Sequence, residues 1–145
     1  MGNTSTLEEI IITTRTTMSG ATWIPSISRL QRLKSLKLHV YGIHEDCLPA
    51  MEEIGRGCPA LEELTLGMRT CDINEGIIAS FCQHPNLKRL RIGSTSLSPA
   101  SLMLMTTFSS LEYLYLRCNV PESILKMLHK HISKIVINKL PTDLY

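Results

Sequence analysis

The sequence has few aromatic residues and only a small excess of positive charge. Aromatic side chains make up 5% of its 145 residues, and 15 Lys and Arg against 13 Asp and Glu give a formal net charge of +2. Proteins that bind nucleic acid or anionic membrane surfaces usually carry a dense Lys/Arg footprint, so this charge argues against both. The hydrophobic content of 43% is enough for one continuous core, which aliphatic residues must fill. We therefore expect a single domain over residues 1–145.

The chain also lacks an apolar run long enough to span a bilayer, and its N-terminus lacks the basic and apolar blocks of a secretory signal. These absences predict an intracellular protein without a membrane span. The first six residues, MGNTST, match the loose pattern for N-myristoylation with Gly2 as the acyl acceptor. Glu8 and Glu9 follow where a second, polybasic membrane signal would be expected, so we favour an unmodified Gly2.

The cysteines form an odd set without a CxxC pair, which argues against a closed disulfide framework and against a zinc ribbon. A reducing compartment, cytoplasm or nucleus, fits this usage. Cys82 with His84, and His129 with His131, bring potential metal ligands close together, but neither pair has a partner pair at ligand spacing. We expect packed thiols, histidines that end the last helix, and neither a metal nor a cofactor. The five cysteines are Cys47, Cys58, Cys71, Cys82 and Cys118.

What the sequence does contain is an internal repeat of the form LxxLxL. Its six copies start at residues 7, 33, 61, 87, 111 and 132, which gives steps of 26, 28, 26, 24 and 21 residues. These steps lie in the leucine-rich repeat range. The strong copies are Leu33–Leu38, Leu61–Leu66, Leu87–Ile92 and Leu111–Leu116, and the weaker ones are Leu7–Ile12 and Ile132–Ile137.

The spacing within each copy predicts a short strand, because residues two apart share a face and the fourth and sixth positions would both point into a core. Between the copies, apolar residues at helical spacing predict helices over 47–56, 74–82, 98–105 and 121–129. Ser98 can cap the third helix and Pro99 suits its first turn, while Gly55 and Gly57 would end the first helix.

One strand and one helix cannot bury their apolar sides alone, so neighbouring units must stack. The predicted fold is an α/β leucine-rich repeat solenoid of about six repeats. We expect a curved parallel sheet on its concave side and helices on its convex side. Both ends of the repeat array are apolar where a solenoid needs polar caps, so we expect them to contact further polypeptide.

Two junctions carry a resemblance to a known family. The stretch GCPALEELTL (Gly57–Leu66), followed by CDIN from Cys71, resembles the cysteine-containing leucine-rich repeats of F-box substrate receptors, and FCQHPNL (Phe81–Leu87) repeats its Cys, Pro and Leu theme. The resemblance implies that these cysteines are small buried residues at the return from helix to strand. It also implies recognition of a ubiquitin ligase substrate. The first copy starts at Leu7, so we expect any F-box to lie on another stretch of polypeptide.

The same resemblance draws attention to Asn119, the asparagine at the eighth offset of the Leu111 copy. The corresponding residues of the other strong copies are Tyr41, Arg69 and Thr95, so a continuous asparagine ladder is absent. We expect the Asn119 amide to hydrogen-bond main-chain groups at the turn after the strand.

Strand alternation leaves one set of side chains on the concave face, where the core does not constrain them. Across the repeats this set reads as a basic stripe beside tyrosines. Arg can clamp a carboxylate or phosphate with paired hydrogen bonds, and Tyr adds apolar area at modest entropic cost. We predict that the stripe binds an acidic or phosphorylated protein segment; the alternative is that it only solvates an exposed sheet. The predicted partner-binding residues are Lys37, His39, Tyr41, Arg69, Arg89, Arg91, Tyr113, Tyr115 and Arg117.

No nucleophile turn, phosphate loop or paired-carboxylate motif is recognisable, so we expect a protein that is not an enzyme. The leading hypothesis is a protein-protein interaction module, in its narrower form the substrate-recognition part of an F-box-like receptor. The alternative is a structural subunit of a larger complex that makes its contacts through the repeat ends. A factor acting on a nucleotide-binding enzyme is a third hypothesis, which rests on fold analogy alone.

Overall fold

The computed structural model describes residues 8–13, 17–18, 30–43, 48–68, 75–82, 84–93 and 97–138. Six strands form one sheet, all neighbours pair in parallel, and their order in the sheet is their order in the chain. A separate parallel pair joins β2 (Thr17–Met18) to β4 (Gly42–Ile43). The strands of the main sheet are β1 (Glu9–Thr13), β3 (Ser35–Val40), β5 (Glu63–Met68), β6 (Arg89–Gly93), β7 (Tyr113–Arg117) and β8 (Lys134–Ile137).

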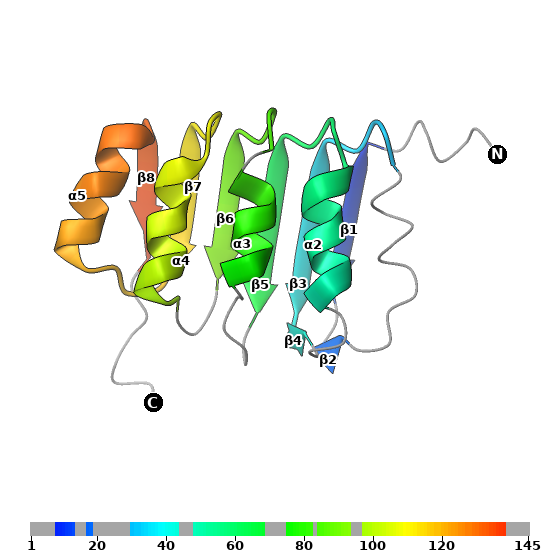
Figure 1. Ribbon diagram of the computed structural model, residues 1–145. Coiled ribbons are helices and arrows are strands. Elements are labelled where there is room, and N and C mark those ends of the chain that lie inside the picture. The colour runs from blue at the N-terminus through cyan, green and yellow to red at the C-terminus, as the bar shows by residue number, and fades with distance from the viewer. Residues whose placement is uncertain are drawn as a thin grey trace.

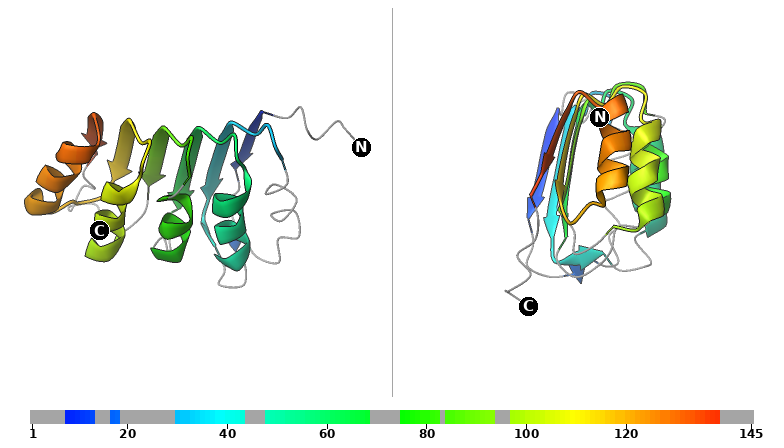
Figure 2. Two further views of the ribbon diagram at one scale, coloured as in Figure 1. Left: turned by 45° about the horizontal axis from the view of Figure 1, so that its top comes forward. Right: turned by 90° about the vertical axis from the view of Figure 1, so that its left-hand side faces the viewer.

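The helices lie together on one face of the sheet (Figures 1 and 2). Each connects two neighbouring strands, which is the usual way to join parallel strands. In the part of the chain that the structure describes, no helix or strand covers the opposite face. The helices are α2 (Leu48–Gly57), α3 (Glu75–Cys82), α4 (Pro99–Leu104), the 3₁₀ turn η3 (Met105–Thr107) and α5 (Glu122–His131).

The six LxxLxL-like segments lie side by side and in register, as the repeat predicts. The fourth position of each copy pairs with the fourth position of the next, and the sixth with the sixth. The first row of aligned residues is Ile10, Leu36, Leu64, Leu90, Leu114 and Ile135, and the second is Ile12, Leu38, Leu66, Ile92, Leu116 and Ile137. The observed architecture is therefore α/β, with a six-stranded parallel sheet covered by helices on one side.

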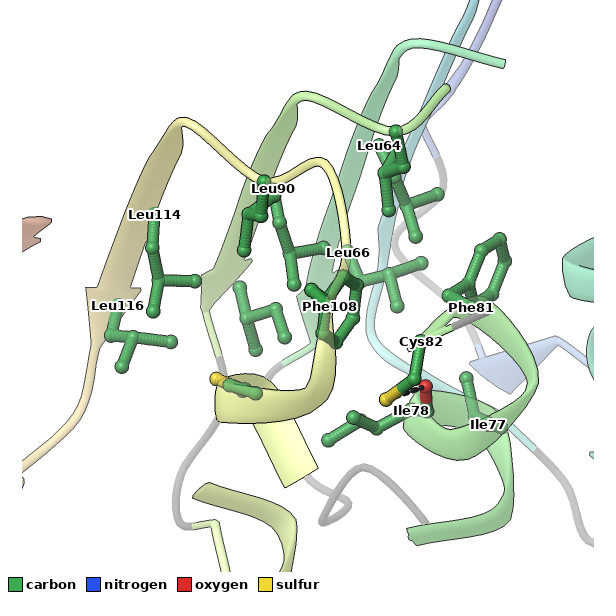
Figure 3. Close-up of a cluster of buried hydrophobic side chains, with 14 of the residues drawn as sticks. Leu64, Leu66, Ile77, Ile78, Phe81, Cys82, Leu90, Phe108, Leu114 and Leu116 are labelled. Carbon is green, nitrogen blue, oxygen red and sulfur yellow. Dashed lines mark hydrogen bonds between the residues drawn. The ribbon is translucent and has the colours of Figure 1, made fainter. Parts of the chain in front are cut away.

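The core fills the space between the sheet and the helices (Figure 3). Leu64, Leu90 and Leu114 point from the strands to the side of the sheet on which the helices lie. All of these side chains are buried, and each fully buried aliphatic side chain contributes about 1.5 to 3 kcal/mol to stability. From the second copy onward, the first residue of the copy is buried as well, since it enters the same core from the preceding turn. These residues are Leu33, Leu61, Leu87, Leu111 and Ile132.

The start of α4 agrees with its predicted cap. The Ser98 hydroxyl accepts a hydrogen bond from the Ser101 main-chain N–H at 3.1 Å, and Pro99 occupies the first turn. Because the first N–H groups of a helix have no partner within it, this bond satisfies a donor that would otherwise be free.

The prediction that Gly55 ends a helix is wrong. Gly55 lies inside α2, which continues to Gly57. A Cβ atom at Gly55 would lie 2.8 Å from Cβ of Ser80 on α3, closer than real side chains approach. Gly55 is therefore explained by the close packing of two neighbouring helices.

The prediction for Asn119 is also wrong. Asn119 follows β7 and is exposed, and within the described residues its amide makes no hydrogen bond. The residue before it, Cys118, is the buried one, with 2% of its surface exposed.

Candidate functional site

Every second side chain of the strands projects from the sheet face opposite the helices, which we name the open face. Because the strands are in register, these side chains form rows that run across the sheet. The first row is Glu9, Ser35, Glu63, Arg89, Tyr113 and Lys134, the second is Ile11, Lys37, Thr65, Arg91, Tyr115 and Val136, and the third is Thr13, His39, Gly67, Gly93 and Arg117.

Cationic and aromatic side chains gather on the open face over β6, β7 and β8. No strand of these three contains an acidic residue. The cations on them are all exposed, and the two tyrosines are half-buried. We name this part of the open face the basic–aromatic surface, and its residues are Arg89, Arg91, Tyr113, Tyr115, Arg117 and Lys134.

Arg91 lies against both tyrosines of the neighbouring strand. Its Cζ is 5.4 Å from the ring centroid of Tyr113 and 6.0 Å from that of Tyr115. Nζ of Lys134 approaches Tyr113 from the next strand, at 5.8 Å from its ring centroid. Each distance is within the range in which a cation is attracted to an aromatic face. The two rings thus hold the Arg91 guanidinium in place. These three strands contain no carboxylate that could pair with its N–H donors.

The Tyr115 hydroxyl is positioned by a second neighbour. The Asn138 side-chain amide donates a hydrogen bond to it over 3.1 Å, from the residue that follows β8. A phenolic hydroxyl that accepts such a bond keeps its own proton available for donation. Tyr115 can therefore present one more donor beside Arg91.

The open face over β1, β3 and β5 has a different character. The Lys37 ammonium pairs with the Glu9 carboxylate at 3.9 Å, and Glu63 adds a second carboxylate in the same region. Ser35 lies between these acids in the first row; it is 7% exposed, and its hydroxyl has no hydrogen-bond partner in the described part of the chain. Acidic and basic side chains therefore lie together on this half of the open face, whereas the charged residues of β6, β7 and β8 are all cations.

The structure brings together part of the predicted binding set. Arg89, Arg91, Tyr113, Tyr115 and Arg117 all lie on the basic–aromatic surface. The remaining predicted residues lie elsewhere: Lys37 and His39 are on β3, Tyr41 follows β3 and is 44% exposed, and Arg69 lies outside the described residues.

Lys134 and Asn138 belong to this region but are missing from the predicted set. Lys134 pairs in register with Tyr113, and its side chain contacts the same ring as Arg91. The alternation that identifies Arg89 and Tyr113 applies equally to the copy that starts at Ile132, so the sequence carried a signal for Lys134. The bond from Asn138 to Tyr115 depends on side-chain geometry and has no such signal.

The described thiols are buried and poorly suited to nucleophilic chemistry. Burial raises the pKa of Cys58 from 9.0 to about 11, and it also raises the pKa of Cys82 and of Cys118. A thiol is reactive as its thiolate, so these three stay protonated and inert at neutral pH. Their burial agrees with the predicted role as packed residues.

The Cys82 and His84 pair is occupied by main-chain partners. The Cys82 thiol contacts the carbonyl oxygens of Ile78 and Leu104, at 3.2 and 3.3 Å. The His84 Nε2–H donates to the Cys58 carbonyl oxygen at 2.5 Å, and Nδ1 accepts from the Asn86 N–H at 3.4 Å. Among the residues whose positions are described, no three His, Cys, Asp or Glu side chains are arranged to hold a metal ion.

Helices in the described ranges are all too short or too polar to cross a membrane. A scan of protein-family models gives no match to this sequence, and a search of curated proteins gives no significant match. Function is therefore inferred from the residues themselves and from their geometry.

Proposed function

We propose that this protein is a non-enzymatic protein-interaction module, built as a leucine-rich repeat solenoid, whose open face binds an acidic segment of a partner protein. The repeat interpretation is supported by steps of 21 to 28 residues and by strands that pair in register from β1 to β8. In such a solenoid the open face is the concave side, and its side chains are free to serve recognition because they take no part in the core.

The observation that carries this proposal is the concentration of unbalanced cations around two ordered tyrosines. Arg89, Arg91, Arg117 and Lys134 project from three adjacent strands that contain no acid. Side-chain rotamer entropy lost at an interface costs about 0.5 to 1.5 kcal/mol per side chain, and Arg91 loses less because the tyrosines already hold it. Preorganised Arg beside Tyr is typical of residues that dominate binding energy at protein interfaces.

Charge complementarity defines the partner. Carboxylates would form charge-assisted hydrogen bonds with the guanidinium groups, each worth about twice a neutral hydrogen bond. A phosphorylated side chain offers the same chemistry with more charge. The F-box-like receptor is the narrower form of the proposal, and its support is the resemblance of Gly57–Leu66 and Phe81–Leu87 to the repeats of that family.

A second candidate, a structural subunit of a larger complex, is favoured by one observation. Ile11 projects from β1 on the open face with 56% of its surface exposed, beside Lys37 and away from the basic–aromatic surface. Within the described sheet β1 is an edge strand, and an unpaired strand edge can pair with another chain. In this alternative the contacts are made at β1 and do not depend on Arg91.

The experiment that tests the proposal is charge reversal on the open face. Cross-linked partners of wild type would be compared by mass spectrometry with those of the double variant Arg89→Glu/Arg91→Glu. The control, Lys126→Glu/Lys130→Glu, changes the net charge equally on exposed positions of α5, in the helical layer. We expect the open-face variant to lose its partner and the control to keep it, with both variants retaining the circular dichroism spectrum of wild type.

Equal capture by wild type and the open-face variant would reject the basic–aromatic surface as the binding site. If Ile11→Glu loses the partner and Arg89→Glu/Arg91→Glu keeps it, the structural-subunit alternative is the better account. Phosphatase treatment of the partner separates the two sources of negative charge, because only a phosphorylated segment would then lose binding.

A further inference from the structure

The third row of the open face is interrupted beside the basic–aromatic surface. Residues from four adjacent strands follow one another in this row: His39, Gly67, Gly93 and Arg117. The two glycines therefore separate an imidazole on β3 from a guanidinium on β7. Glycine weakens a strand because it loses more conformational entropy on folding and offers no side chain to pack.

The described residues explain one of these glycines and give no packing reason for the other. A Cβ atom at Gly67 would lie 3.1 Å from Nδ1 of His39, so the imidazole leans over Gly67 and takes the space of its missing side chain. Among the described residues, the nearest atoms to a Cβ at Gly93 would be Cβ of Arg117 and Cα of Gly67, both at 3.9 Å. Gly93 also lacks the positive φ that favours glycine. A glycine of this kind in a strand often marks a place where a ligand approaches closely.

The spacing of the strands around Gly93 suits an aromatic ring laid over it. The His39 imidazole lies over Gly67 on β5, and Arg117 is on β7, with β6 between these strands. Neighbouring strands are about 4.8 Å apart, so β5 and β7 are about 10 Å apart. A ring over Gly93 would lie one strand spacing, about 5 Å, from each neighbouring strand, which is a separation preferred by stacked rings and by a cation over a ring. Arg91 is two residues before Gly93 on the same strand, so cationic donors border the space.

We propose that the acidic segment bound by the open face inserts an aromatic side chain over Gly93, between His39 and Arg117, while its neighbouring carboxylates meet Arg91 and Arg89. This inference rests on the proposed function and adds the residue type that anchors the partner. The partner is thus an acidic segment with an aromatic anchor, and Gly93 is a specificity-determining residue.

The test uses a phage-displayed library of random linear peptides, selected on immobilised wild-type protein. Enriched peptides would be synthesised with the aromatic residue intact or replaced by alanine, and their affinities measured by fluorescence anisotropy. Three variants would be compared with wild type. Gly93→Val fills the space over Gly93, His39→Ala removes one of its walls, and Thr13→Val introduces the same side chain in the same row on β1.

We expect enriched peptides to contain an aromatic residue flanked by acids and to bind Gly93→Val at least about tenfold more weakly than wild type, a difference of about 1.4 kcal/mol. The alanine-substituted peptides should bind wild type and Gly93→Val equally, and Thr13→Val should bind like wild type. His39→Ala should weaken only the aromatic peptides. Because valine suits a strand better than glycine, Gly93→Val should also raise Tm, which separates lost binding from lost structure.

Acidic peptides without an aromatic preference, or with affinity unchanged by Gly93→Val and His39→Ala, would overturn this inference and leave the proposed function intact. Two results would overturn both this inference and the proposed function. One is that the enriched peptides bind Arg89→Glu/Arg91→Glu as well as wild type, and the other is that the selection enriches no acidic peptides.

Discussion

At the scale of single residues, the returns from helix to strand are held by side chains that bond the main chain of the preceding unit. His84 supplies one such bond, to the carbonyl of Cys58. These side chains bond carbonyl groups of the turns that follow α2 and α3, and so tie each turn to the next unit. The other two bonds run from Asn86 Nδ2 to the Pro59 oxygen, 2.8 Å, and from Ser110 Oγ to the Pro85 oxygen, 2.6 Å.

The buried thiol at one of these returns predicts a loss of stability at alkaline pH. Burial raises the pKa of Cys58 to about 11 in the folded protein, from an ordinary value of 9.0. The folded state binds this proton more tightly, so its contribution is complete below about pH 9 and is lost as pH rises through about 11. The shift corresponds to about 3 kcal/mol. Urea unfolding at about pH 8 and about pH 11 should show a smaller alkaline loss for Cys58→Ala than for wild type. Equal losses in both proteins would contradict this account of Cys58.

At the same scale, some neighbouring side chains could be predicted from the sequence alone. Strand alternation identified Arg89, Arg91 and Arg117 as neighbours, because in-register parallel strands place equivalent positions side by side. The stacking of Arg91 on two tyrosines could not be predicted from the sequence, because it depends on the rotamers of these side chains. The expectation for Asn119 came from resemblance to a family, and its physical basis is absent because the side chain is exposed.

At the scale of elements, α2 and α3 pack so closely that one added methyl group between them is expected to push the helices apart. In most helices Gly→Ala gains up to about 1 kcal/mol. At Gly55 the added Cβ would clash with Ser80, so we expect Gly55→Ala to lower the free energy of unfolding by about 1 to 3 kcal/mol in a urea titration. The sequence predicted a helix end at Gly55. The close contact between α2 and α3 could not be predicted, because it produces no recognisable pattern in the sequence around Gly55.

Two further variants control this prediction. Glu53→Ala changes an exposed position of the same helix and should shift stability by less than about 0.5 kcal/mol. Ser80→Gly in the Gly55→Ala background should restore stability only in part, because the main-chain carbon of residue 80 would remain 3.0 Å from the new Cβ. A Gly55→Ala protein as stable as wild type would show that the two helices can separate freely.

At the scale of the whole molecule, a ladder of charged residues lies beside the apolar rows. The residues that enter the strands alternate in sign across the sheet, and the main-chain N–H of Lys34 donates to the Glu8 carbonyl, as that of Lys88 does to Glu62. Ion pairs of 3.8 Å and 3.9 Å accompany these two contacts. Exposed pairs contribute about 0 to 1 kcal/mol each, so the ladder adds little to the free energy of unfolding. Its members are Glu8, Lys34, Glu62, Lys88 and Glu112.

The repeat made this architecture predictable, because a period of 21 to 28 residues with two inward aliphatic positions has few other ways to bury its apolar face. The division of the open face into a half with both acids and bases and a half with cations alone was harder to predict from the sequence. It depends on pairings such as Lys37 with Glu9, which join residues from different copies.

The most direct test of the central claim is a map of amide chemical-shift changes while an acidic peptide from the phage selection is titrated into isotope-labelled protein. We predict that the largest changes fall on β6 and β7, at Arg91, Gly93, Tyr115 and Arg117, with little change on α4 and α5. Changes confined to the helical layer or to β1 would contradict binding at the basic–aromatic surface.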